Sequence, residues 1–144
     1  MRRVIFVAAL LIVLCLSGLS TNAGRVAGPV PQNLQSYAGK YPSALLKDVP
    51  SLKRRLRVVL GGNYSFFMAR MQTEMPIEYV EGCLVAIGCR AHSCGSEDAV
   101  MVIHLGNGKM HCAIRSNKFN GGYRVYSEDK QNIPHALYRA MEQY

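Results

Sequence analysis

Residues 89–96 read Cys-Arg-Ala-His-Ser-Cys-Gly-Ser, and three of these side chains could do chemistry. Cys89 and Cys94 could form a disulfide, ligate a metal ion or, as thiolates, attack a substrate. His92 lies between them and could bind a metal, transfer a proton or hydrogen-bond to a carboxyl group. The choice among these chemistries depends on the redox state of the cysteines and on the elements that hold the segment.

The N-terminus has the features of a secretory signal peptide. Two arginines precede an apolar run over residues 4–16, and small residues follow it. A run of this length is too short for a membrane span, which needs about 20 residues. We therefore predict a cleaved signal at 1–23, a periplasmic location and no stable membrane insertion of the mature chain. A lipoprotein signal would need a small residue before Cys15, and Leu14 stands there.

Signal cleavage would remove Cys15 and leave Cys83, Cys89, Cys94 and Cys112, which could pair in three ways. An even number of cysteines in an exported chain favours disulfides, because that compartment is oxidising. We predict a Cys89–Cys94 bond, which needs only a tight loop. Export also favours a bond between Cys83 and Cys112, because unpaired thiols are hazardous there. In a simple meander, however, these two would lie about 10 Å apart, beyond the ~7 Å reach of a disulfide.

A metal site and a hydrolase are the two other chemistries that these side chains could support. Structural zinc ligands usually come in two close pairs, a spacing that the segment and its candidate partners do not show. A Cys/His hydrolase needs a free thiol beside a base. We expect no metal, no cofactor and no catalysis here. The further ligands that a metal site could recruit are Cys83, Cys112, His104 and His111. We interpret His104, His111 and His135 as surface residues of strands and a helix.

The mature chain has the size of one domain, predicted over residues 24–144. Apolar residues make up 49% of the chain and charged residues 18%, which is enough apolar surface for a core and argues against disorder. The length excludes two-domain dinucleotide enzymes, barrels and solenoids. Signal cleavage leaves 15 of the 17 basic residues against 9 acidic ones, a formal charge of +6.

Helical periodicity precedes a period of two along the mature chain. A short helical turn begins at Pro42, a helix runs from Ser51 to the glycines at 61 and 62, and a second helix ends before Pro76. The order predicts an α+β fold, with an antiparallel meander sheet of about four to five strands covered by helices on one face. The later elements are a strand over 77–87 with an irregularity near Gly82, a strand over 99–105, a hairpin turn at 106–108, a strand over 110–114, a turn at 121–122, a strand from Tyr123 and a helix over 133–143.

In this arrangement the segment 89–94 lies at the tip of a hairpin between two strands. A ring closed by Cys89 and Cys94 is too small to bury itself, so His92 would face solvent. An exposed imidazole on a pre-ordered loop is typical of a binding tip, because the ordering entropy is lost before contact and not on association. The alternative is a stapled turn with a structural role alone.

The pattern Cys-x-x-His-x-Cys-Gly-Ser, followed by the apolar strand 99–105 in an exported α+β chain, resembles the Ivy family, the inhibitors of vertebrate lysozyme. The resemblance is clear over about residues 80–105, and the order of elements extends it to most of the mature chain. The family's loop usually reads Cys-Lys-Pro-His-Asp-Cys. Arg90, Ala91 and Ser93 are therefore departures from the pattern.

The resemblance implies a non-enzymatic inhibitor that acts through this loop. The disulfide-closed loop of the family enters the active-site cleft of a c-type lysozyme, where its histidine contacts the catalytic carboxyl groups. These roles carry over to Cys89, His92 and Cys94, with Arg90 as an additional cation. The loss of proline predicts a less ordered loop, and serine in place of aspartate removes a carboxylate, so we expect weaker affinity.

Charge bears on which enzyme is the target. Because c-type lysozymes are usually basic, a protein of charge +6 would be repelled during encounter. We expect Glu97 and Asp98, just behind the loop, to offset this repulsion in part. The resemblance also permits endogenous lytic transglycosylases as targets, since their clefts rely on an acidic group as well.

A basic helix face supports a different interpretation. Lys53, Arg54, Arg55 and Arg57 lie opposite the apolar stripe of their helix. They could form a solvated face or bind an anionic envelope glycan or lipid, with the loop merely structural. We do not expect nucleic acid as a partner of an exported protein. A homodimer is possible.

Overall fold

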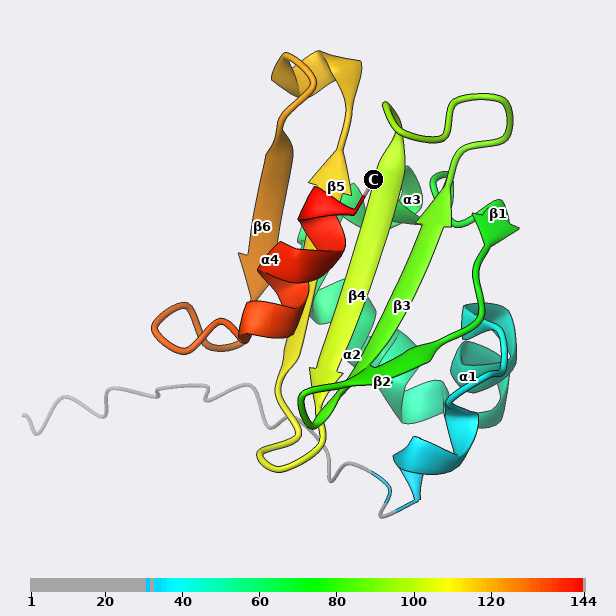
Figure 1. Cartoon of the computed structure of the whole chain (residues 1–144), viewed down its shortest axis with the longest axis vertical. Helices are drawn as coiled ribbons and strands as arrows, with labels where there is room; N and C mark the ends of the chain where they lie inside the picture. The colour runs from blue at the N-terminus through cyan, green and yellow to red at the C-terminus, as the bar shows by residue number, and fades with distance from the viewer. Residues whose placement is uncertain (1–30, 32, 144) are drawn as a thin grey trace, which may run out of the picture.

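The computed structural model describes residue 31 and residues 33–143 (Figure 1). The predicted signal peptide lies outside the described residues. Within the described part of the chain, no helix has the length and apolarity to cross a bilayer. The helices are α1 (Pro42–Asp48), α2 (Pro50–Leu60), α3 (Tyr64–Met68) and α4 (His135–Glu142), with 3-10 turns η1 (Leu34–Tyr37), η2 (Gly61–Asn63) and η3 (Asn117–Phe119). The strands are β1 (Thr73–Glu74), β2 (Glu78–Val80), β3 (Cys83–Cys89), β4 (Asp98–His104), β5 (Met110–Arg115) and β6 (Tyr123–Ser127).

The strands form one antiparallel sheet in the order β1-β3-β4-β5-β6, and β2 also pairs with β3. The α+β class and the meander are therefore confirmed. The predicted single strand over 77–87 is a hairpin instead. Glu81 and Gly82 both have positive φ, 52° and 76°, and they reverse the chain between β2 and β3. The predicted irregularity is this turn, and it brings the sheet to six strands.

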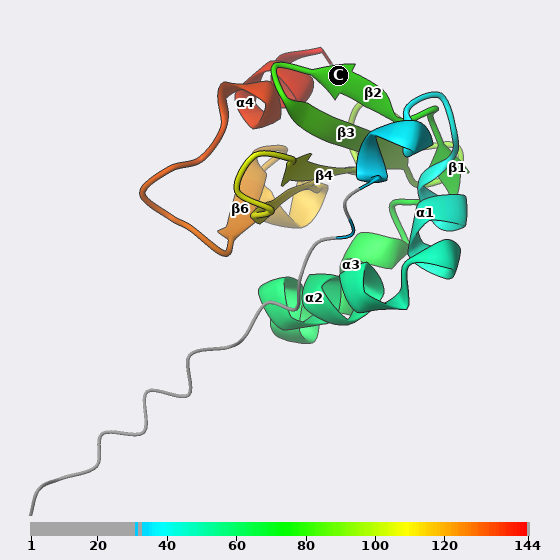
Figure 2. The same ribbon diagram turned by 90° about the horizontal axis from the view of Figure 1, so that it is seen from below.

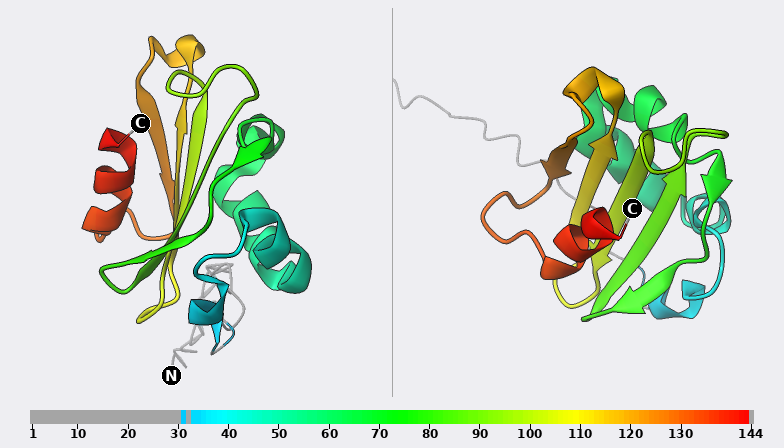
Figure 3. Two further views of the ribbon diagram at one scale, coloured as in Figure 1. Left: turned by 45° about the vertical axis from the view of Figure 1, so that its right-hand side comes forward. Right: turned by 45° about the horizontal axis from the view of Figure 1, so that its top comes forward.

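Helices cover both faces of the sheet, which corrects the prediction that they cover one. α1, α2 and α3 pack on one face and α4 packs on the other, as Figures 2 and 3 show. The central strands β3 and β4 are buried along almost their whole length for this reason. A half-exposed strand alternates apolar and polar residues, whereas a strand covered on both faces is a continuous apolar run. The run Ala-Val-Met-Val-Ile in β4 is of the second kind.

The predicted bond between Cys83 and Cys112 is wrong. Both are free, buried thiols. Cys83 lies on β3 and faces α4, whereas Cys112 lies on β5 and packs in the opposite core against the other helices. The strand β4 separates them in the sheet. A disulfide would therefore have to cross both a strand and the plane of the sheet.

The basic face of α2 is smaller than its sequence suggests. Lys53, Arg54 and Arg57 are exposed. Arg55 is 7% exposed, and its guanidinium donates to both carboxylate oxygens of Glu128, at 3.0 and 2.5 Å. It also donates to the carbonyl of Gly108 at 2.5 Å. Arg55 is therefore a buried link from α2 to the turn before β5 and to the residue that follows β6, and the interpretation of it as a surface cation is wrong.

Candidate functional site

The segment 90–97 connects β3 to β4 at the upper end of the sheet in Figure 1. The two strands stay in register up to the pair Cys89 and Asp98. Cys89 is bonded to Cys94, with 5.0 Å between their Cα atoms. The predicted disulfide is therefore present. It closes a ring whose first member is the last residue of a buried strand.

Backbone hydrogen bonds fix the shape of this loop in addition to the disulfide. The Arg90 amide donates to the Glu97 carbonyl at 2.8 Å, which continues the ladder one step past the strands. The Ser93 amide donates to the Arg90 carbonyl at 3.0 Å, and the Glu97 amide donates to the Ser93 carbonyl at 3.0 Å. The Ser96 hydroxyl donates to the same Ser93 carbonyl at 3.0 Å. These bonds divide the loop into two consecutive tight turns.

The exposed residues of the loop are among those that the sequence predicts to contact a partner. Arg90, Ala91, His92 and Cys94 are exposed, and Ser93 is half-buried. His92 has a φ of 62°, in the left-handed region that non-glycine residues seldom occupy, although histidine is among those enriched there. The turn is stabilised by its closing bonds, so this conformation persists before any partner is bound.

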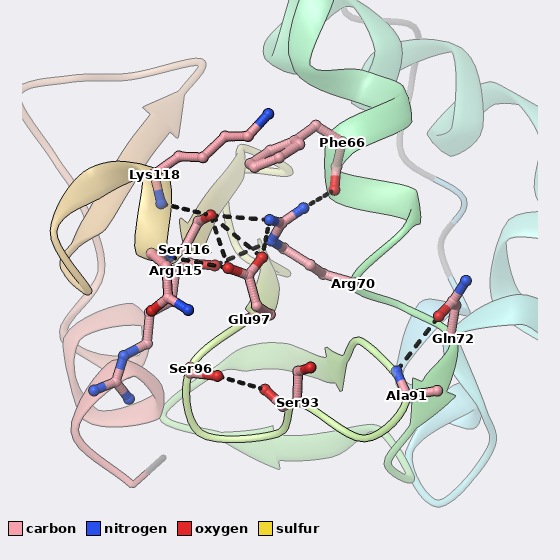
Figure 4. A network of polar contacts seen from close by, with 11 residues as sticks. Phe66, Arg70, Gln72, Ala91, Ser93, Ser96, Glu97, Arg115, Ser116 and Lys118 are labelled. Atoms are coloured by element: carbon pink, nitrogen blue, oxygen red, sulfur yellow. Dashed lines mark hydrogen bonds and ion pairs between the residues drawn. The ribbon is translucent and has the colours of Figure 1, made fainter.

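Ala91 stands where the pattern that this segment resembles has proline, and its backbone N–H makes a hydrogen bond that proline could not make. The Ala91 amide donates to the side-chain carbonyl of Gln72 at 3.4 Å (Figure 4). This contact fastens the tip to the segment between α3 and β1. This hydrogen bond compensates in part for the rigidity that is lost without a proline ring.

A buried polar network holds the base of the loop. Glu97 is 8% exposed and Arg70, which follows α3, is 3% exposed, and their side chains form an ion pair. The Ser116 hydroxyl accepts from the Arg70 guanidinium at 3.0 Å and donates to the Glu97 carboxylate at 3.0 Å. The Asn117 amide donates to the same carboxylate at 3.0 Å, and Arg70 donates to the Phe66 carbonyl at 2.8 Å. Figure 4 shows α3, the loop and the β5–β6 connection meeting at this carboxylate.

The electrostatics of the two acidic residues follow from their partners. Burial alone would raise the pKa of Glu97, but hydrogen bonds from the Asn117 amide and the Ser116 hydroxyl, together with the charge of Arg70, lower it. Burial raises the pKa of Asp98, against a hydrogen bond from the Gly95 amide and the nearby charge of Arg115. Both carboxyl groups therefore face inward. The expectation that they present negative charge beside the loop is wrong.

The histidines outside the loop divide between surface and core. His135 is exposed, and His104 is half-buried and accepts through Nδ1 from the Gly106 and Asn107 amides. His111 is fully buried, its Nδ1 lies 2.8 Å from the Ser127 hydroxyl, and burial lowers its pKa, so the prediction of a surface residue is wrong. Across residues 31 and 33–143, no group of three or more histidine, cysteine, aspartate or glutamate side chains is placed to hold a metal ion. The disulfide also occupies the two sulfurs that a zinc site or a nucleophile would need.

One comparison with known proteins identifies the chain. The sequence model of the family Inhibitor of vertebrate lysozyme (Ivy) matches residues 51–143, which run from α2 to the end of α4 and include the whole loop. The chain belongs to the Ivy family. Ivy proteins are inhibitors and not enzymes, so membership implies a lysozyme inhibitor. No curated protein sequence and no solved structure matches the chain.

The cysteine pairing of this Ivy protein can be mapped by peptide mass spectrometry. We expect Cys89 and Cys94 in one disulfide-linked peptide, and Cys83 and Cys112 as thiols that react with iodoacetamide in urea but not in the folded protein. Burial of both thiols raises their pKa values and removes the reactive thiolate. A mapped link between Cys83 and Cys112 would contradict the structure.

The ion pair at the base of the loop predicts a pH-dependent loss of stability in Glu97→Gln. Removal of the Glu97 charge leaves the buried Arg70 guanidinium without a counter-charge. We therefore expect the free energy of unfolding to fall by about 3 kcal/mol at pH 7. Because the pKa of Glu97 is lower in the folded protein, its stabilising contribution is present above the unfolded pKa of about 4.3 and is lost as the pH falls through the folded value.

Urea denaturation at pH 7 and pH 3 measures this effect. The difference between wild type and Glu97→Gln should be large at pH 7 and should shrink at pH 3. The control is Glu78→Gln, which alters an exposed carboxylate on β2 and should stay within about 0.5 kcal/mol of wild type. A difference that does not change with pH would show that Glu97 acts through packing and not through its charge.

Proposed function

We propose that this Ivy protein inhibits lysozyme by inserting the loop from Cys89 to Cys94 into the active-site cleft, with His92 as the central contact. The observation that carries the proposal is the exposed imidazole on a loop closed by a disulfide and by its own backbone bonds. Such a loop loses little conformational entropy on association. Inhibition then requires no chemistry by the inhibitor, because occupation of the cleft excludes the substrate.

The chemistry of a glycosidase cleft suits an imidazole. The cleft holds one carboxyl group that donates a proton and a second that is ionised. An imidazole can donate a hydrogen bond to the ionised group and, when it is charged, attract both groups in a site from which water is excluded. Arg90, exposed two residues earlier, supplies a second cation at the mouth of the cleft. The cleft of a lytic transglycosylase, which also relies on an acidic group, could accept the same loop.

Export to the periplasm is part of the proposal. Its support is the sequence of residues 1–23, together with a disulfide that an oxidising compartment would maintain. N-terminal sequencing of the protein recovered from a periplasmic fraction tests it, and Gly24 is the expected first residue. A chain that keeps Met1 and remains in the cytoplasm would contradict it.

The decisive variant is His92→Ala. We expect it to weaken inhibition of a c-type lysozyme by about 30-fold or more, because truncation of a central contact costs about 2 kcal/mol or more. The measurement is the inhibition constant in a cell-wall lysis assay. His135→Ala is the matched control, since it removes an exposed imidazole from α4, and it should inhibit like wild type. Equal potency of wild type and His92→Ala would reject the loop mechanism.

A further inference from the structure

A cluster of aromatic rings and cations lies beside the loop, on α3, η3 and β6. The rings of Phe66 and Phe119 have their centroids 5.8 Å apart. The guanidinium of Arg124 lies 4.0 Å from the centroid of Phe119, and the Lys118 amine lies 5.3 Å from that of Phe66. On its inner side the Phe66 ring meets the buried Arg70 guanidinium, at 3.4 Å. We call the four outer residues, Phe66, Lys118, Phe119 and Arg124, the cation–aromatic cluster.

The cluster is joined to the loop through the Glu97 network. Glu97 belongs to the loop, and its carboxylate accepts from the Asn117 amide at the start of η3. Its partner Arg70 packs on Phe66. In Figure 1 the β5–β6 connection and the loop lie at the same end of the sheet, and Figure 4 shows Lys118 and Phe66 on the far side of the carboxylate from Ser93. The cluster and the loop are therefore linked neighbours at one end of the sheet.

The exposed charged side chains of the loop and of the cation–aromatic cluster are all positive. Arg90, Lys118 and Arg124 are exposed, and none of the ion pairs among the described residues involves them. The carboxylates close by are already engaged. Those of Glu97 and Asp98 are buried in the network. The half-buried Glu74, which pairs with the end of β3, accepts a hydrogen bond from the Ser43 hydroxyl at 2.6 Å.

We infer that the cation–aromatic cluster is a second contact surface and that it selects lytic enzymes whose cleft is bordered by acidic side chains. The inference rests on the proposed function, because the inserted loop brings the two surfaces together. Lys118 and Arg124 would attract the acidic border during encounter, and opposite charges at the edge of an interface mainly raise the association rate. The aromatic rings hold the two cations in place, so less side-chain entropy is lost when they pair.

The test uses two c-type lysozymes that have the same catalytic carboxyl groups but opposite net charge. Association rates with the mature protein are measured by surface plasmon resonance at several ionic strengths. Removal of both cations in Lys118→Gln/Arg124→Gln should slow association with the acidic lysozyme about fivefold at low salt and should speed association with the basic one. Both changes should disappear at high salt, because screening removes the interaction.

The control removes the same charge elsewhere. Lys53→Gln/Arg54→Gln neutralises two exposed cations of α2 and should change either rate less than twofold. The single variant Lys118→Gln, which leaves the Arg124 contact with Phe119 intact, provides a milder version if the double variant folds poorly. Equal effects of the two double variants, or no effect with either lysozyme, would overturn the inference.

The design separates this inference from the proposal on which it rests. If His92→Ala abolishes inhibition while the cluster variant behaves like its control, the loop mechanism stands and the inference on the cluster is wrong. If His92→Ala inhibits like wild type, the loop mechanism itself is wrong. If wild type binds neither lysozyme, both are wrong.

Discussion

The buried pair of Arg70 and Glu97 is the interaction on which the presentation of the loop depends. A carboxylate that is 8% exposed needs a counter-charge and hydrogen-bond donors, because an unpaired buried charge is costly. Arg70, Ser116 and the Asn117 amide supply them from two other parts of the chain. The contacts of the Glu97 carboxylate therefore hold the end of α3 and the β5–β6 connection against the loop. The disulfide closes the loop, and this network sets its orientation relative to the sheet.

The sheet can carry such a loop because its central strands are covered on both faces. With α1 to α3 on one side and α4 on the other, a one-residue shift of β3 or β4 would move every side chain from one core into the other and disrupt the packing of both. Their pairing therefore ends at a defined place, the pair Cys89 and Asp98. A loop that begins at a fixed register needs only a few bonds of its own to become rigid.

The sequence predicts the elements that depend on local periodicity and turn chemistry, and it fails where a contact joins distant segments. The fold class and most of the helices follow from periodicity, and the disulfide between Cys89 and Cys94 follows from their spacing together with the predicted export. The second helix, predicted to end before Pro76, instead ends at Met68 and is followed by β1. Arg55 fell on the polar side of a helical stripe, and its burial depends on Glu128, 73 residues later. Arg70 carries no local signal at all. Glu97 does carry a local signal. It stands directly before an apolar strand, and an acidic side chain that is buried with such a strand needs a partner.

The same network links the stability of the loop to the charge that it displays. Glu97 is the last residue of the loop and Asp98 the first of β4, and both side chains are buried, where they accept hydrogen bonds from the amides of Asn117 and Gly95. The charge of Glu97 is largely balanced by its partner Arg70, and Asp98 lies 3.8 Å from the guanidinium of Arg115, so neither carboxylate presents an unpaired negative charge at the tip. The exposed charge near the loop is then set by the cations that remain outside, Arg90 among them. The positive surface of the loop therefore has two causes, the exposure of Arg90 and the use of both neighbouring carboxylates in buried contacts that hold the base of the loop.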